Sequence, residues 1–270
     1  MSAQLRELGR FLRDRRARLR PAEVGLAAGN GRRRVAGLRR EEVATLAGVG
    51  VTWYTMLENG SADGVSLATL DALAGALHLS PGERGYLLSL ADQTEVEQPC
   101  PQAGELALGA LAAIEWAPAY VCTTQWTVLA WNAAMSFVWE IEAPGGPPFN
   151  IVQRMFADPA IRALHGTRFP AFARALVAMV RSGAGRRADD PVYRAIYEGL
   201  HDDAIFAAAW DAYDVAAPQG SVRTTIDSPR AGEFAYDALT LPIPDDAGHS
   251  LVVQVPDGPS AARLRRVLRD

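Results

Sequence analysis

Residues 38–60 (LRREEVATLAGVGVTWYTMLENG) contain two short helical patterns separated by a glycine. In the first pattern, Val43, Leu46 and Ala47 recur at helical spacing. Gly48 then ends the pattern, because glycine adopts the left-handed conformation of a helix end at little steric cost. The stretch therefore predicts two helices joined by a tight turn, which is how a chain places one helix in a DNA groove.

The second predicted helix has two different faces. Val51, Tyr54 and Leu57 form its apolar face, and AsnGly at 59–60 supplies a stop signal. The opposite face holds side chains suited to contacting base edges in the major groove, namely Thr52, Thr55, Met56 and Asn59, with Trp53 at its margin. A helical hairpin inside any all-α core would show the same glycine turn, so the pattern alone leaves both interpretations open.

Charge is concentrated at the same end of the chain. Residues 1–60 carry 12 Arg and 6 acidic residues, a net charge of +6, so residues 61–270 carry −10. A basic segment of this kind favours contacts with DNA phosphates, although a solvated arginine-rich face remains the alternative. The expected phosphate contacts are Arg32, Arg33, Arg34, Arg39 and Arg40. Glu58 is expected to pair with Arg13 or Arg16 of the first helix.

The remaining patterns divide the chain into two domains. Helices are predicted at about 3–19 and 66–77, and a capping box at Ser80 and Glu83 begins another that ends near Ala91. The polar stretch that follows contains two prolines and suits an exposed linker. The predicted boundaries are 1–92 for a five-helix domain, 93–102 for the linker and 103–270 for a second domain.

The second domain mixes strands and helices. Aromatic and branched residues at 119–123 and 126–131 predict a hairpin. Helical stretches fill about 132–213, and three strands and a helix follow at about 221–227, 233–243, 249–256 and 260–269. This order predicts an α+β fold in which helices cover an antiparallel sheet and a small molecule can lodge between the layers.

Large apolar side chains of this domain outnumber their polar partners. Core packing explains each of them singly, but together they also suit an apolar pocket. The predicted ligand-binding residues are Trp126, Trp131, Phe137, Met155, Phe156, Phe172, Met179 and Trp210, with Phe169 among the same apolar group. Arg154, Arg174 and Arg181 are candidates for pairing a ligand carboxylate.

Other function classes have little support. His165, His201 and His249 lack metal-ligand spacing, and no nucleophile elbow or phosphate-binding glycine loop is present. HisAspAsp at 201–203 is interpreted as a helix cap. We therefore expect no enzymatic activity and no required cofactor.

Composition bears on compartment and redox state. Cys100 and Cys122 are too few for a metal site and are expected to be free thiols, although a disulfide between them stays open. No run of about 18 apolar residues and no apolar signal segment occurs, so we expect a cytoplasmic protein without a membrane partner.

Several segments together resemble the MmyB-like transcription regulators, bacterial proteins that pair an XRE-type helix-turn-helix with a PAS-like ligand-binding domain. They include LGRFLRDRRARL at 8–19, GLRREEVA at 37–44, VTWYTMLENG at 51–60, TVLAWNAA at 127–134, FADP at 156–159 and YDALTLP at 236–242. The resemblance implies binding of double-stranded DNA and of a fatty-acid-like or other hydrophobic ligand. Because helix-turn-helix proteins usually read two half-sites, a homodimer is also expected.

Two departures from the family pattern are visible. Family members usually have serine where Gly50 stands. Glycine is the weaker N-cap, by a few tenths of a kcal/mol. They commonly have ArgAsn where this chain has Phe149 and Asn150, so a ligand contact made by that arginine is in doubt here. An alternative for the second domain is a dimerisation or protein-interaction platform without a ligand.

Overall fold

The computed structural model describes residues 3–26, 37–62, 64–91, 102–187, 189–216, 222–243 and 248–268. The predicted contacts Arg32, Arg33 and Arg34, Cys100 and nearly all of the predicted linker lie outside the described residues. The chain groups into two compact units. The first unit is Met1–Glu95 with Arg181–Asp190 and Tyr213–Ala217, and the second is Val96–Val180, Pro191–Ala212 and Pro218–Asp270.

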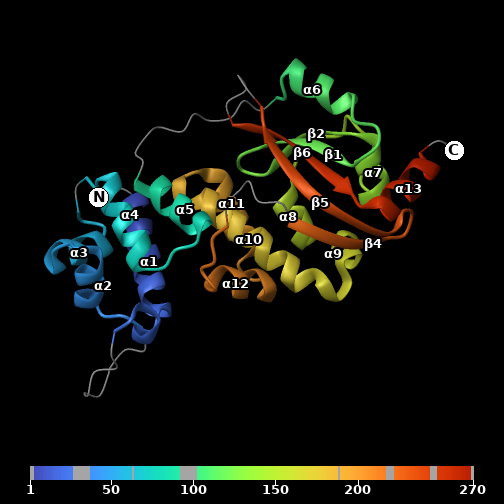
Figure 1. The fold of residues 1–270 in the computed structure, drawn as a ribbon. Coiled ribbons are helices and arrows are strands. Elements are labelled where there is room, and N and C mark those ends of the chain that lie inside the picture. The colour runs from blue at the N-terminus through green and yellow to red at the C-terminus, as the bar shows by residue number, and fades with distance from the viewer. Residues whose placement is uncertain are drawn as a thin grey trace. The chain divides into compact units, whose positions relative to one another are not determined.

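The first unit is helical throughout its N-terminal part (Figure 1). Its helices are α1 (Ala3–Arg18), α2 (Arg40–Ala47), α3 (Val51–Glu58), α4 (Leu67–Ala76) and α5 (Pro81–Ala91), with a 3-10 turn η1 at Pro21–Val24. All five predicted helices are confirmed. The Ser80 and Glu83 capping box is confirmed as well, because the backbone N–H of each residue donates to the other's side chain.

The glycine turn between α2 and α3 has the predicted geometry. Gly48 has a φ of 67°, in the left-handed region that ends a helix. Two predicted core positions beside the turn were wrong, because Leu46 and Val51 are each 39% exposed. Ala44 is buried instead, since it lies on the inward side of α2.

Helices α1 and α3 approach each other closely at Gly9. A β-carbon at this position would lie only 2.2 Å from the backbone oxygen of Glu58. Glycine therefore allows the two backbones to touch. This contact fixes the C-terminal end of α3 against the core of the unit.

Two later segments complete the first unit, whereas the sequence placed both in the second domain. The carboxylate of Glu7 accepts hydrogen bonds from Tyr86 at 3.2 Å and from Tyr213. It also lies 3.9 Å from the guanidinium of Arg181. These buried polar contacts tie the returning segments to α1 and α5.

The second unit is built on one six-stranded antiparallel sheet. Its strands are β1 (Ala119–Thr123), β2 (Thr127–Trp131), β3 (Phe149–Asn150), β4 (Val222–Ser228), β5 (Gly232–Pro242) and β6 (His249–Pro256), in the order β3-β2-β1-β6-β5-β4. The five predicted strands and the predicted α+β class are confirmed. The two-residue β3 is too short to leave a period in the sequence.

Helices of this unit lie on both faces of the sheet (Figure 1). They are α6 (Glu105–Ala112), α7 (Ala133–Trp139), α8 (Ile151–Ala157), α9 (Pro159–His165), the part of α10 (Phe169–Arg186) before Arg181, α11 (Pro191–Leu200), α12 (Ala204–Asp211) and α13 (Gly258–Val267), with a 3-10 turn η2 at Gly166–Arg168. Helix α6 packs on one face through Ala107 and Leu111, which contact an apolar cluster of β1 and β6. Helix α10 lies over the opposite face.

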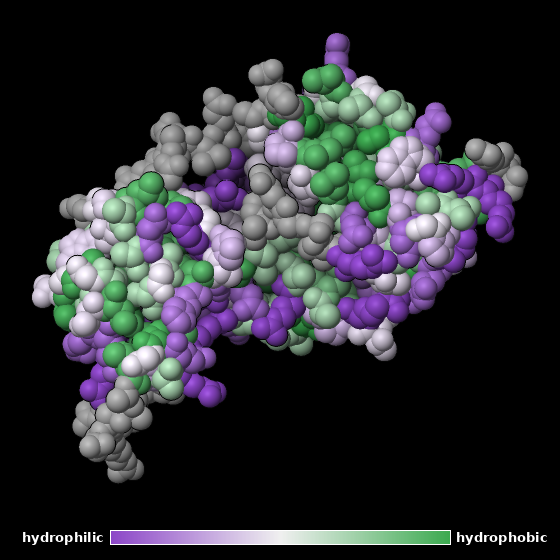
Figure 2. All heavy atoms as spheres, viewed as in Figure 1, coloured by the Kyte–Doolittle hydropathy of each residue, from purple (hydrophilic) through white to green (hydrophobic). Residues whose placement is uncertain are grey.

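The face on which α6 packs is only partly covered. Leu239, Leu241 and Val255 are exposed there, and Figure 2 shows an apolar area over the sheet.

None of the helices in the described part of the chain has the length and apolar character needed to cross a bilayer.

Candidate functional site

The candidate DNA-contacting residues lie on and before α3. Thr52, Met56 and Asn59 are exposed, with Met56 accessible over 43% of its surface. Thr55 is half-buried, and its hydroxyl donates to the backbone oxygen of Val51 at 2.8 Å. Trp53 is half-buried against the core of the unit. The face opposite Tyr54 and Leu57 is therefore open along most of its length.

Gly50 precedes this helix as its N-cap. Its φ of −71° and ψ of 136° are extended, and no side chain caps the helix there. Glycine leaves the first N–H groups of α3 without the acceptor that serine would bring, at a cost of a few tenths of a kcal/mol.

Arg39 and Arg40 differ in their surroundings. Arg39 is exposed just before α2, and its backbone N–H donates to the carboxylate of Glu42 at 2.6 Å. Arg40 is half-buried, and its Nε lies 2.7 Å from the carboxylate of Glu58. Both stay predicted phosphate contacts, and the Arg40 guanidinium in addition holds α2 to α3 through Glu58.

Glu58 joins three helices. Its side chain is fully buried and accepts from Arg16 Nε at 2.6 Å and from Arg16 Nη2 at 3.1 Å, in addition to Arg40. Arg13 donates instead to the backbone oxygen of Glu58 at 3.1 Å. The predicted pairing with Arg16 is confirmed.

These bonds decide the ionisation of Glu58. Burial alone raises the pKa of its carboxyl group, but hydrogen bonds from Arg16 and Arg40 outweigh that effect. The pKa of Glu58 therefore lies below its usual value, and the group is a carboxylate at neutral pH. The cluster sets the angle at which α3 leaves the core.

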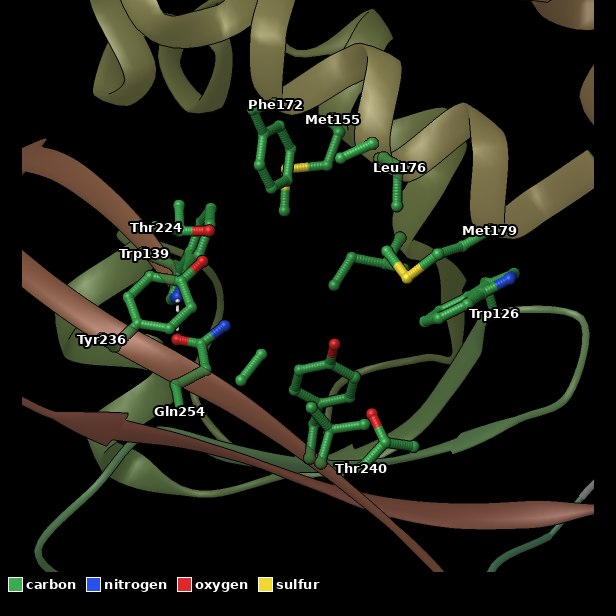
Figure 3. A pocket seen from close by; sticks show the side chains of 15 residues that line it. Trp126, Trp139, Met155, Phe172, Leu176, Met179, Thr224, Tyr236, Thr240 and Gln254 are labelled. Carbon is green, nitrogen blue, oxygen red and sulfur yellow. Dashed lines mark hydrogen bonds between the residues drawn. The ribbon is translucent and has the colours of Figure 1, made fainter. Parts of the chain in front are cut away.

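The second unit contains an apolar cavity between the sheet and α10 (Figure 3). It encloses about 670 Å³ of empty space, counting its open mouth. From the helical side, its walls include Phe172, Leu176 and Met179 of α10 and Met155 of α8.

The floor of the cavity follows from the register of the strands. Tyr120 of β1 lies opposite Val252 of β6, which lies opposite Thr240 of β5. Gln254 is paired with Ala238, and Tyr236 with Thr224. Because side chains alternate along a strand, these residues share one face of the sheet. All of them line the cavity.

The predicted ligand-binding residues fall into two groups of equal size. Trp126, Met155, Phe172 and Met179 line the cavity, whereas Trp131, Phe137, Phe156 and Trp210 do not. The cavity is also lined by Tyr120, Trp139, Tyr236, Thr240 and Gln254, which were not predicted. The alternation of side chains along β5 and β6 could have indicated the strand residues, but the prediction was based on large apolar side chains.

The four residues outside the cavity have other contacts. The indole N–H of Trp131 donates to Ser136 and to the backbone oxygen of Glu142. Phe137 packs under the guanidinium of Arg230 at 4.8 Å. Phe156 meets Phe169 and Phe206 edge to face, and Trp210 stacks on Phe206 with a centroid distance of 5.6 Å. Of the four, Trp131 and Phe156 are buried, whereas Phe137 and Trp210 are half-buried.

None of the three candidate arginines lines the cavity. Arg154 pairs with Glu142 at 2.7 Å and lies over the ring of Phe149. Arg174 is exposed on α10, and Arg181 is buried beside Glu7 in the first unit. A carboxylate in the cavity would therefore have no guanidinium partner among them.

The segment 201–203 has a structural role. The Asp203 carboxylate accepts from the backbone N–H groups of Ile205 and Phe206 and pairs with Arg162 at 2.8 Å. The interpretation of Asp203 as the cap of α12 is confirmed. Although burial raises the pKa of its carboxyl group, these hydrogen bonds lower it overall.

The comparisons with known families agree with this geometry. Residues 7–87 match a helix-turn-helix domain, and residues 105–268 match the ligand-binding domain of MmyB-like transcription regulators. No curated protein matches the chain. A helix-turn-helix followed by a domain with an internal cavity defines a DNA-binding transcription regulator with a ligand-binding C-terminal part. The chain belongs to the MmyB-like transcription regulator family.

Proposed function

We propose that the protein binds DNA as a homodimer through α3 and that the cavity of its second unit binds a hydrophobic small molecule of the fatty-acid class. The observation that carries the ligand part is the cavity of about 670 Å³, whose helical wall is aromatic and Met-rich. Methionine adapts to irregular shapes, so such a wall suits an alkyl chain. A domain that served only as a platform would not need this empty space.

The homodimer part of the proposal has separate support. Leu239, Leu241 and Val255 leave part of one sheet face apolar and exposed (Figure 2). Exposed apolar areas of this kind mark interaction sites, and a regulator that reads two half-sites needs a second copy. Analytical ultracentrifugation of Leu241→Arg tests this interface. We expect the variant to be monomeric, and an unchanged dimer would place the interface elsewhere.

Arg39→Ala and Met56→Ala are expected to affect DNA binding in different ways. Because Arg39 is exposed before α2, its loss should weaken binding to all duplexes and lower the salt slope by about 0.9. Met56 lies on the exposed face of α3, and its loss should change preference at one base position by about 1–3 kcal/mol. Fluorescence anisotropy with selected and random duplexes at several salt concentrations separates the two effects.

Arg84→Ala is the matched control for this pair, since it removes an arginine of α5 that is paired with Asp71. It should change neither the salt slope nor the base preference. If Met56→Ala weakens binding to random and selected DNA equally, Met56 does not read bases.

Ligand affinity should rise with chain length. Burial of each CH₂ contributes about 0.8 kcal/mol, so each added carbon should tighten binding about fourfold until the cavity is full. Isothermal titration of delipidated protein with acyl compounds from octanoyl to hexadecanoyl measures this dependence. Leu176→Trp places a larger side chain in the cavity wall and should shorten the longest chain accepted. Absence of binding at every length would favour the platform alternative.

A further inference from the structure

The cavity has a polar end with a fixed hydrogen-bond donor. Gln254 is only 3% exposed, and its Oε1 accepts from the indole N–H of Trp139 at 2.7 Å. This bond assigns the amide orientation, because the indole nitrogen can only donate. The Gln254 NH₂ group consequently points away from Trp139 (Figure 3). Among the described residues it has no hydrogen-bond partner.

Tyr120 adds a second polar group to the same end. It is 6% exposed and lines the cavity, and within the described part of the chain its hydroxyl makes no hydrogen bond. Tyr120 is opposite Val252, so Gln254 is its diagonal neighbour on the adjacent strand. Diagonal neighbours on one sheet face lie within reach of long side chains. Both groups therefore border the cavity from neighbouring positions on one face of the sheet.

The other polar side chains of this end are also uncharged. Tyr236 is buried beside Thr224, its partner on the neighbouring strand. Thr240 completes the row on β5. The described residues that line the cavity include no Arg, Lys, His, Asp or Glu.

The titratable groups around the cavity stay neutral over a wide pH range. Burial raises the pKa of the Tyr120 and Tyr236 hydroxyls well above their usual values, and it raises the pKa of the nearby Cys122 thiol to about 12. His165 stacks on Phe172 behind the wall. Burial, with a smaller contribution from Arg168, lowers the pKa of His165 to about 4. None of these groups carries charge near neutral pH.

A buried carboxylate without a cation is strongly disfavoured, whereas a neutral oxygen acceptor can be satisfied by an amide and a hydroxyl group. We propose that this cavity selects ligands whose polar end is uncharged and accepts hydrogen bonds, such as an amide, an ester, an alcohol or a protonated acid, over carboxylate anions. The inference rests on the proposed ligand-binding function and narrows it to a chemical class.

Dodecanamide, dodecanol and dodecanoic acid test the inference on the full-length protein. The three share one chain length. The heads of the amide and the alcohol are neutral, whereas the head of the acid is charged when it is ionised. Between about pH 5.5 and 8.5, the dissociation constants of the amide and the alcohol should stay constant. That of the acid should rise about tenfold per pH unit, because only its protonated fraction binds. Isothermal titration in delipidated samples gives the three curves.

Two matched variants test the position of the head. Tyr120→Phe removes a hydroxyl that has no partner among the described residues, so the melting temperature should not fall. Its affinity for dodecanamide should fall about 3- to 10-fold. Tyr193→Phe is the control, because the Tyr193 hydroxyl donates to the backbone oxygen of Thr124 at 2.7 Å outside the cavity lining. This variant should lose stability and keep its affinity.

Three results would contradict the inference in distinguishable ways. If the acid binds as tightly as the amide and independently of pH, the cavity accepts the carboxylate and only the head-group inference fails. If none of the three compounds binds at any pH, the proposed ligand function fails and the inference fails with it. Loss of amide affinity in Tyr193→Phe but not in Tyr120→Phe would place the head elsewhere.

Discussion

Replacing Glu58 with alanine should destabilise the helix-turn-helix unit by about 3–5 kcal/mol, the range measured when one partner of a buried ion pair is removed. The carboxylate is fully buried, and Arg16 beside it is only 12% exposed. Without Glu58, the Arg16 guanidinium keeps its bond to the backbone oxygen of Leu38 but has lost its counter-charge. The variant should also bind DNA weakly, since α3 loses its tie to α1 and α2.

Hydrogen–deuterium exchange of peptides from α1 and α3 reports the stability of this unit separately from the second one. Glu58→Gln should lose less, since it keeps one acceptor. Glu41→Ala removes an exposed carboxylate of α2 and should change stability by less than about 0.5 kcal/mol. Equal protection in Glu58→Ala and the unmodified protein would refute the structural role of the cluster.

The same cluster predicts a dependence on pH. A carboxyl group whose folded pKa is depressed stabilises the protein above its unfolded pKa and loses that contribution as the pH falls through the folded pKa. Glu58 is such a group, and its ordinary pKa is 4.5. The stability difference between the unmodified protein and Glu58→Gln should therefore be constant near neutral pH and shrink below about pH 4.5.

The helical half of the fold was predictable because its signals are local. Gly48, the Ser80 and Glu83 box and the 3.6-residue period each depend on neighbours within one or two turns. The errors at Leu46 and Val51 arose where α2 ends and α3 begins, because the burial of side chains there depends on the angle of the turn. The partner of Glu58 was predictable only as one of two arginines, because the choice depends on how α1 crosses α3.

The cavity was less predictable because its floor is set by register. Tyr120, Val252 and Thr240 are far apart in the sequence and become neighbours only when three strands pair. Selection by size favoured Trp131, which is buried outside the cavity, and Trp210, which is half-buried against Phe206, and overlooked Gln254, a polar residue within an apolar strand. Whether a large side chain borders empty space or fills it depends on the packing of every element around it.

Helix α10 is the feature that the sequence least anticipated. It is one continuous helix over Phe169–Arg186, yet its residues from Arg181 onward group with the first unit. Gln4 of α1 donates to the backbone oxygen of Arg186 at 2.7 Å. A β-carbon at Gly185 would lie 1.9 Å from the hydroxyl of Tyr86, so this turn packs directly on α5.

The first part of the same helix lines the cavity with Phe172, Leu176 and Met179. We expect a ligand that favours one position of these residues to bias the turn that contacts Glu7 as well, because both belong to one continuous helix. Coupling free energies between two sites are typically about 1–3 kcal/mol, which corresponds to a change in affinity of about 5- to 150-fold. We expect dodecanamide at saturation to change the affinity for a selected DNA duplex within this range.

Arg181→Ala should bring that ratio of affinities close to one while dodecanamide still raises the melting temperature, because Arg181 contacts Glu7 and does not line the cavity. Arg10→Ala is the matched control, since it removes an exposed arginine from the same carboxylate and should leave the ratio unchanged. Anisotropy titrations of the duplex with and without ligand give the ratio for each variant. If the ligand raises the melting temperature of the unmodified protein but leaves DNA affinity constant, the cavity binds ligand without controlling α3. If the ratio of affinities is undiminished in Arg181→Ala, the coupling does not pass through this contact. A contact that differs between the two states would contribute to the coupling free energy, and its removal would lower the ratio.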